Sequence, residues 1–197
     1  MMWILLGTGA LAVAVVIERL LHYHREQINT AEFLAGVRNV LKRDNVVEAV
    51  SICDATAGPV PRLVKAAILN RDRGKERVRE VLEEAGALEV PRLEDKLTLL
   101  ATVAQIAPLM GLFGTALGLM DLFATMEQQG LSASPALLAG GVWKALICTT
   151  SGLGLAIFAY AAYNYLVSRV NSIVLDMEKS STEILNLVCE AGRGAKE

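Results

Sequence analysis

Charged residues are distributed very unevenly along this chain, and the gaps between them predict its longest helices. The three longest stretches without any Asp, Glu, Lys or Arg are residues 1–17, 97–120 and 145–168. A helix rises about 1.5 Å per residue, so each of the two later runs reaches roughly 36 Å and can cross a hydrocarbon core of about 30 Å. The first run can continue through Glu18 and Arg19 at the headgroup level. A cleaved signal peptide is the alternative there, but the positively charged start of such a signal is missing.

The Lys and Arg residues outside these runs predict how the chain is threaded. Residues 18–96 contain 14 of them, residues 121–134 contain none, and the residues after 168 contain four. Cytoplasmic segments of membrane proteins carry the excess of Lys and Arg. We therefore expect an all-α membrane protein whose N-terminus is periplasmic and whose C-terminus is cytoplasmic. Its expected parts are three transmembrane helices at 1–21, 97–126 and 136–168, cytoplasmic regions at 22–96 and 169–197, and a periplasmic connection at 127–135.

The first cytoplasmic region carries helical patterns of its own. One helix is predicted by the apolar residues Phe33, Val37, Val40 and Leu41. Asn45 and Glu48 then form a capping pair. A second helix is predicted by the apolar residues Val46, Val47, Val50 and Ile52.

Glycine and proline delimit the helices that follow. The Gly-Pro-Val-Pro run at residues 58–61 breaks the chain, and the next helix is expected to end at residues 73–74. Residues 75–96 predict a helix that continues almost unbroken into the second span, with a kink at Pro91. After the third span the sequence lacks Gly and Pro until its last six residues, so the third helix is expected to continue. Helices of the same chain or of a neighbouring copy are expected to cover its apolar stripe, Val170, Ile173, Met177, Ile184 and Leu187.

Composition excludes several classes of function. The net charge of −2 excludes a basic nucleic-acid-binding protein, and three cysteines far apart in the sequence suggest neither a disulfide framework nor a metal site. The run from Gly111 to Thr115 lacks the Lys of a phosphate-binding loop, and no set of nucleophile and base is recognisable. We expect no enzymatic activity, no cofactor and no nucleic-acid partner.

The second and third spans are rich in small residues, which allow helix backbones to approach closely. The candidate packing residues are Pro108, Gly111, Gly114 and Gly118 in the second span and Cys148, Gly152 and Ala156 in the third. These spans are therefore expected to be built for close packing.

Hydroxyl groups in the spans usually bond to a carbonyl one turn earlier, which we expect for Thr98, Thr102 and Thr150. Thr115 and Thr149 differ because each lies on the small-residue face, where a polar lining can contact water. A hydroxyl can relay a proton, but a carrier needs a group that changes its charge near neutral pH. Neither charge-free run contains such an acid, so these spans cannot carry protons alone.

Two motifs of these spans resemble signatures of a known family. Residues 106–118, Ile-Ala-Pro-Leu-Met-Gly-Leu-Phe-Gly-Thr-Ala-Leu-Gly, are similar to the A-P-L-L-G-L-L-G-T-V-x-G signature of the ExbB/TolQ/MotA proton-channel family. Residues 141–153, Gly-Val-Trp-Lys-Ala-Leu-Ile-Cys-Thr-Thr-Ser-Gly-Leu, with Tyr163-Asn164 resemble its G-I-x-E-A-L-x-x-T-x-x-G-L…Y-N signature. Three spans favour the ExbB/TolQ branch over the four-span flagellar stators.

The resemblance implies a pentamer of this subunit in the inner membrane, around a small single-span ExbD/TolR-like partner that supplies an essential Asp. Thr115 and Thr149 match the family's two pore-lining threonines, and Thr150 and Lys144 complete the candidate ion pathway. Proton flow, with sodium as the alternative ion, would drive a TonB- or TolA-like protein that reaches the outer membrane. Each charge that crosses contributes about 2.3 kcal/mol per 100 mV.

One position departs from the family pattern. The family signature has an acid five residues before the threonine that matches Thr149, and this chain has Lys144 there. Lys144 lies about 14 Å along the helix from Pro135. At that depth a lysine either snorkels to the outer interface or is neutralised by a carboxylate. Asp121 on the antiparallel neighbour reaches a comparable depth, so we expect an Asp121/Lys144 charge pair, within or between subunits.

Other functions stay open at this point. A Tol-type envelope or cell-division motor and a specialised motor would use the same core motifs. A passive membrane scaffold, in which the polar residues serve only packing, is the weaker alternative.

Overall fold

The structure is a computed structural model that describes residues 2–26, 28–43, 45–129 and 135–194. Within these residues the chain is helical and contains no strand, so the expected all-α class is confirmed. The elements are α1 (Met2–Glu26), α2 (Thr30–Leu41), α3 (Val46–Ala55), α4 (Pro59–Leu69), the 3₁₀ helix η1 (Arg71–Arg73), α5 (Lys75–Glu94), α6 (Leu97–Gln129) and α7 (Pro135–Gly194). Residues 130–134 of the expected periplasmic connection and residues 195–197 of the expected extension lie outside the described residues.

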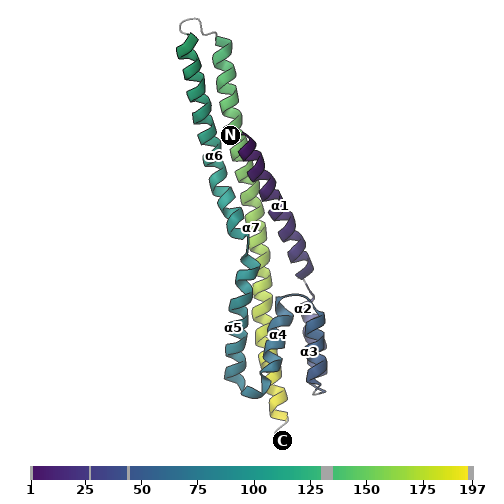
Figure 1. The fold of residues 1–197 in the computed structure, drawn as a ribbon. Helices are drawn as coiled ribbons and strands as arrows, with labels where there is room; N and C mark the ends of the chain where they lie inside the picture. The colour runs from purple at the N-terminus through teal and green to yellow at the C-terminus, as the bar shows by residue number, and fades with distance from the viewer. Residues whose placement is uncertain (1, 27, 44, 130–134, 195–197) are drawn as a thin grey trace. The chain divides into compact units, whose positions relative to one another are not determined.

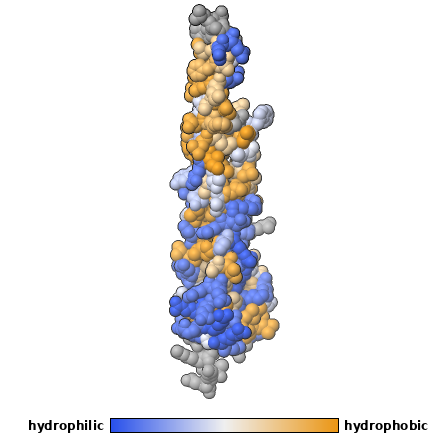
Figure 2. Space-filling model, turned by 60° about the vertical axis from the view of Figure 1, so that its left-hand side comes forward, coloured by the Kyte–Doolittle hydropathy of each residue, from blue (hydrophilic) through white to orange (hydrophobic). Residues whose placement is uncertain are grey.

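Three of the described segments are long and apolar enough to cross a membrane: Met2–Tyr23, Lys75–Gln128 and Leu138–Val188. The chain divides into two compact units, which we describe separately. The apolar unit comprises Met1–Arg19 and Lys96–Leu166, and the polar unit comprises Leu20–Asp95 and Val167–Glu197. In Figure 2 orange covers most of the apolar unit, whereas blue dominates the polar unit.

In the apolar unit, α6 and α7 run side by side in opposite directions, and α1 lies along α7 (Figure 1). Up to Gly114 the buried residues of α6 recur every three or four positions, at Leu97, Leu100, Ala104, Ala107, Gly111 and Gly114, and Leu122 follows two turns later. Those of α7 recur every seven positions: Ala145, Gly152, Ala159 and Leu166. These spacings place one seam of each helix against its neighbour. Large apolar side chains such as Trp3 and Ile157, 85% and 72% exposed, point away from the seam, as helices in lipid require.

A sharp break separates α5 from α6. Lys96 adopts a φ of 63°, which is unusual for a residue that carries a Cβ, and its ammonium group pairs with Glu18 of α1. The helix expected over residues 75–96 thus ends at Glu94, and its interruption before the second span lies at Asp95 and Lys96. Pro91 lies inside α5, which continues to Glu94, because a proline removes only one backbone donor from the helix.

The polar unit is built around α4. Gly58 has a φ of 129° and is followed by Pro59 in the first helical turn, which confirms the predicted break. The helix then buries most of its apolar residues, Val60, Leu63, Val64, Ala67 and Ile68. It ends at Leu69, earlier than expected, because the chain passes into the short 3₁₀ helix η1 before Gly74.

The capping pair that precedes α3 is confirmed, but the buried face of this helix is not the expected one. The Asn45 side chain accepts a hydrogen bond from the Glu48 amide at 3.3 Å and donates one to the Glu48 carboxylate at 2.8 Å. Val47 is 80% exposed, whereas Ala49 and Cys53 are buried. A helix of ten residues with apolar side chains on several faces has no unique period, and α2 and α4 pack against its smaller residues.

The second half of α7 is covered within the same chain, as expected. Its stripe residues Val170, Ile173, Met177 and Ile184 are buried, and Leu187 is half-buried. Arg38 of α2 pairs with Glu183 of α7 at 2.7 Å, so a short helix is tied to this face. Tyr23 donates a hydrogen bond of 2.6 Å to the Leu93 carbonyl, which joins the end of α1 to α5.

Candidate functional site

Two threonines meet at the seam between α6 and α7. The hydroxyl oxygens of Thr115 and Thr149 are in direct hydrogen-bonding contact, and both residues are half-buried. The Thr115 hydroxyl also lies 3.0 Å from the Ala145 carbonyl on α7 and 3.1 Å from the Gly111 carbonyl on its own helix. A hydroxyl has one proton to donate, so at any moment Thr115 donates to one of these three oxygen atoms. The structure therefore brings together the two threonines that the sequence singled out.

The close approach of the two backbones explains this contact. A Cβ added at Gly152 would lie 2.7 Å from the Ala107 carbonyl oxygen and 2.8 Å from the Gly111 Cα. A Cβ added at Gly111 would lie 3.0 Å from the Cys148 carbonyl oxygen. No larger residue fits between these backbones without moving them, so the glycines set the distance at which the threonine hydroxyls touch.

The remaining packing candidates lie along the same helices. Gly114 is buried, and Pro108, Cys148 and Ala156 are half-buried. A Cβ added at Gly118 would lie 3.2 Å from the Ala145 Cβ, so this glycine also faces α7.

The other span threonines bond mainly to their own helices. Thr102 donates to the Thr98 carbonyl at 2.8 Å and Thr150 to the Leu146 carbonyl at 3.0 Å, which confirms the expected back-bonds. Thr98 makes no such bond in the described structure, because α6 begins at Leu97 and offers no carbonyl one turn earlier. Thr150 is exposed on the α7 surface, and its hydroxyl bonds to Leu146 and not to the Thr115–Thr149 pair in the described structure.

Lys144 and Asp121 line one hollow of about 580 Å³ beside the seam, together with the small residues Gly114, Gly118, Gly140 and Gly141. Both charged side chains are exposed. Within the described chain neither forms an ion pair, with the other or with any third residue. The charge pair expected from the sequence thus stays a prediction, although its two members share one surface.

The described residues hold no group of three or more His, Cys, Asp or Glu that could bind a metal ion. At the Thr115–Thr149 contact the seam offers hydroxyl and carbonyl oxygens, and residues 97–120 and 145–168 contribute no carboxylate to it. Such a lining can solvate a proton or a hydrated ion and can relay a proton along hydrogen bonds. It cannot store one, because the pKa of a hydroxyl is far above neutral pH.

Sequence reasoning missed two contacts at the seam. The Ala145 carbonyl accepts from Thr115, and Gly141 packs so closely on Leu122 that an added Cβ would lie 2.5 Å from its Cδ1 atom. Both residues continue the series of small residues in the third span toward its beginning. Extending that series from Cys148 back to Gly141 would have predicted the full length of the contact.

Comparison with known proteins identifies the family. Residues 55–179, more than half of the chain, match the model of the MotA/TolQ/ExbB proton channel family. A putative biopolymer transport protein, ExbB-like 3, of Synechocystis is 35% identical over 157 residues, which cover 78% of this chain and 73% of that protein. A putative ExbB homolog of Methanothermobacter thermautotrophicus is 25% identical over 178 residues, 89% of this chain but only 62% of the relative. The TolQ protein of the Tol-Pal system of Haemophilus influenzae is 43% identical over 88 residues, 45% of this chain and 38% of that protein. The matched region contains both threonines, all of α6 and most of α7, and the chain belongs to the MotA/TolQ/ExbB proton channel family.

Proposed function

We propose that this chain is an ExbB/TolQ-like subunit of an ion-driven motor in the inner membrane. Five copies surround the transmembrane helices of a small ExbD/TolR-like partner. Proton flow through the ring drives mechanical work on a TonB- or TolA-like protein that reaches the outer membrane. The N-terminus and the connection between α6 and α7 are periplasmic, and the C-terminus is cytoplasmic.

The observation that carries this proposal is the hydroxyl pair at the seam. Thr115 and Thr149 come from two different apolar helices, yet their hydroxyl groups contact each other. A polar group in hydrocarbon costs several kcal/mol unless it is hydrogen-bonded, so two hydroxyls placed together within an apolar seam favour a polar path. The seam lacks a carboxylate of its own, so in our proposal the partner supplies the Asp that carries the proton.

Partner-dependent proton flux tests the proposal. The chain and its small partner are reconstituted in vesicles, and proton entry is followed with an internal pH dye under an applied potential. Thr149→Val removes a hydroxyl and keeps the shape of the side chain, so we expect it to abolish most of the flux. Thr102→Val is the matched control, because Thr102 lies on α6 and bonds only to its own helix.

Equal flux in the wild type and the Thr149→Val variant would favour a passive scaffold instead. Replacing the proton gradient by a sodium gradient in the same vesicles distinguishes the two candidate ions. A flux that follows sodium and not pH would replace the proton by sodium in the proposal.

The relatives leave the cargo system open between two motors. Relatives named ExbB and a relative named TolQ both match the chain, and the TolQ match is the more similar over a shorter region. A Tol-type envelope or cell-division motor is therefore the second candidate. Co-purification from native membranes, followed by mass identification of the small partner, distinguishes the two.

A further inference from the structure

The hollow beside the seam reaches the residues next to the threonine contact. On α6 it is lined by Gly114, which directly precedes Thr115. On α7 it is lined by Cys148, which directly precedes Thr149. Ala145 lines the hollow too, and the Ala145 carbonyl accepts a hydrogen bond from Thr115. The space of the hollow thus begins beside the hydroxyl pair that carries the proposed function.

Two charged residues line the hollow farther along the two helices. Asp121 follows Thr115 by six residues on α6, a rise of about 9 Å. Lys144 precedes Thr149 by five residues on α7, a rise of about 7.5 Å. Because α6 and α7 run in opposite directions, both charges lie on the same side of the threonine contact (Figure 1). The described residues that line the hollow include no other Asp, Glu, Lys or Arg.

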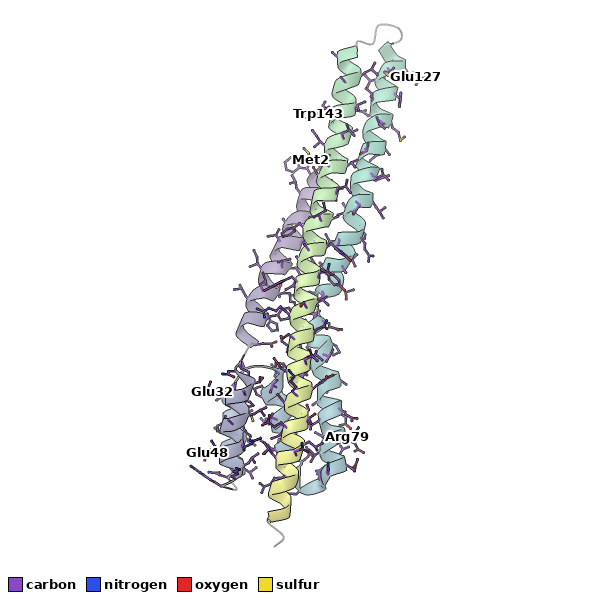
Figure 3. The ribbon with its side chains drawn as sticks, turned by 180° about the vertical axis from the view of Figure 1, so that it is seen from behind. Met2, Glu32, Glu48, Arg79, Glu127 and Trp143 are labelled. Atoms are coloured by element: carbon purple, nitrogen blue, oxygen red, sulfur yellow. The ribbon has the colours of Figure 1, made fainter. Side chains whose placement is uncertain are left out.

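Beyond the two charges the hollow continues toward the connection between α6 and α7, where Thr125 and Ala136 line it. Trp143, the neighbour of Lys144, lies on α7, and Glu127 lies farther toward the tip of α6 (Figure 3). In the proposed topology this end of the two helices is periplasmic. An ion that enters the hollow from the periplasm therefore meets the two charged residues before it reaches the threonines.

The hollow is large and polar enough to hold water. Its volume of about 580 Å³ corresponds to roughly 19 water molecules at about 30 Å³ each. Four glycines in its wall leave this space open, and the Asp121 carboxylate and the Lys144 ammonium group provide hydrogen-bond partners for water. Water in the hollow can therefore bring a proton to the residues beside the threonine contact.

A proton and a sodium ion interact differently with these two groups. Sodium is attracted by the Asp121 carboxylate, but the Lys144 ammonium group cancels much of that attraction. A proton can form a bond with a carboxylate oxygen and can then leave to the next water molecule. At an effective dielectric constant of about 20, two unit charges roughly 12 Å apart repel by about 1.4 kcal/mol, which is tenfold in an equilibrium. A round hollow of 580 Å³ is only about 10 Å across, so Lys144 acts on any cation within it.

We propose that Asp121 and Lys144 form the proton-selective mouth of the ion pathway. Asp121 takes a proton from water in the hollow, becomes a neutral acid and releases the same proton to water on the side of the threonines, so no other reactant is needed. Lys144 keeps sodium from accumulating beside the carboxylate. This inference rests on the proposed function and adds to it the two residues that select the ion.

The test compares proton flux with sodium flux in the same complex. The chain is reconstituted with its small partner in vesicles, and an internal pH dye or an internal sodium dye follows each ion under the same applied potential. Each flux is divided by the amount of assembled complex, which size-exclusion chromatography measures. We expect the wild type to conduct protons in preference to sodium.

Lys144→Gln removes the ammonium group and keeps a side chain of similar length. The Asp121 carboxylate then attracts sodium without opposition, so we expect the sodium flux to rise about tenfold, while the proton flux changes little. An unchanged ratio of proton flux to sodium flux would overturn the selectivity that we assign to Lys144.

Asp121→Asn keeps the size of the side chain and removes the group that takes up the proton. A positioned proton-transfer group contributes about 100-fold or more in catalysis, and water at an open mouth replaces part of this, so we expect the proton flux to fall about tenfold. Asp121→Glu should retain most of it. Glu127→Gln is the matched control, since Glu127 is an exposed acid on the same helix outside the hollow, and it should change neither flux. Wild-type proton flux in Asp121→Asn would overturn the relay.

Exchanging the two charges provides a variant that keeps both groups in the hollow. Asp121→Lys combined with Lys144→Asp should retain proton flux and the preference over sodium. An assembled complex of this variant that conducts no protons contradicts the inference, even if the single variants fail to assemble. A pair that serves only packing predicts less assembled complex with an unchanged flux per complex, and this result would also contradict it.

Failure of this inference differs from failure of the proposed function. A wild-type complex that conducts neither ion would remove the proposed function and the inference together. A wild-type complex that conducts protons, with both single variants equal to it in both fluxes, would remove the inference alone.

Discussion

The two threonines of the seam have different hydrogen-bond partners. Thr115 can donate to Thr149, to Ala145 across the seam and to Gly111 in its own helix, whereas the Thr149 hydroxyl is hydrogen-bonded, among the described residues, only to Thr115. Thr115→Val should therefore lower the free energy of unfolding in detergent by about 1 kcal/mol, the size of one interhelical hydrogen bond, and Thr149→Val by less. Titration with a denaturing detergent, followed by circular dichroism, measures both. A larger loss for Thr149→Val would show that its hydroxyl has partners beyond Thr115.

Cys53 in the polar unit is predicted to be an unreactive thiol. Burial, with the neighbouring Asp54 carboxylate as the smaller cause, raises its pKa from 9.0 to about 11. The thiolate is the nucleophile, so the shift of about two units lowers its fraction at pH 8 roughly 100-fold. In a variant in which Cys53 is the only cysteine, we expect alkylation to be slower by about this factor than for a free thiol.

Ser51→Cys, in a chain without other cysteines, is the matched control because Ser51 is exposed on the same helix. It should react at the rate of an exposed thiol, and fast labelling of Cys53 would contradict the burial. The neutral thiol is favoured in the folded state, so ionisation of the unfolded chain begins first as pH rises. The free energy of unfolding should accordingly fall between about pH 9 and pH 11 in the wild type, and less in Cys53→Ser.

Single residues were predicted from the sequence where the signal was local. The Asn45–Glu48 pair follows from a spacing of three residues, and Thr115 and Thr149 follow from motifs around each of them. The bond from Thr115 to the Ala145 carbonyl was not predicted, because a backbone acceptor carries no residue-specific signal. The burial of Cys53 was not predicted either, because it depends on how α2 and α4 pack on α3.

At the scale of helices, the separation of α6 and α7 depends on Gly152. Gly152→Ala would place a Cβ 2.7 Å from the Ala107 carbonyl oxygen, against backbone that cannot rotate away. We expect a loss of about 1–3 kcal/mol in stability, the usual cost of overpacking, and a loss of partner-dependent proton flux as the threonine hydroxyls separate. Denaturation in detergent and the vesicle assay measure the two effects.

Gly154→Ala is the matched control, because a Cβ at Gly154 meets nothing within 4 Å. It should leave flux and stability close to wild type. If both alanine variants behave alike, the close approach at Gly152 does not determine the function of the seam.

Helices were predictable where apolar patterns are long and unpredictable where they are short. The 60 residues of α7 follow from the lack of glycine and proline after the third span. The break between α5 and α6 was missed because Lys96, in a left-handed conformation, gives no signal in its residue type. The predicted buried face of α3 was wrong because a helix of ten residues can have several apolar faces. Tertiary packing buries the face with Ala49 and Cys53.

At the scale of the whole molecule, the predicted topology places the end of α6 on the periplasmic side of the membrane and α5 on the cytoplasmic side. Glu127 and Glu76 are exposed and lie on these two helices, so each can carry a reporter without disturbing a core. In intact cells expressing a cysteine-free chain, a membrane-impermeant maleimide admitted to the periplasm should label Glu127→Cys and leave Glu76→Cys unlabelled until the membrane is opened. The positive-inside argument requires this order, because the Lys and Arg residues are concentrated between the first two spans. Labelling of Glu76→Cys in intact cells would show that the predicted topology is inverted. The connection between α6 and α7 would then lie in the cytoplasm, which does not fit a motor that works on the outer membrane.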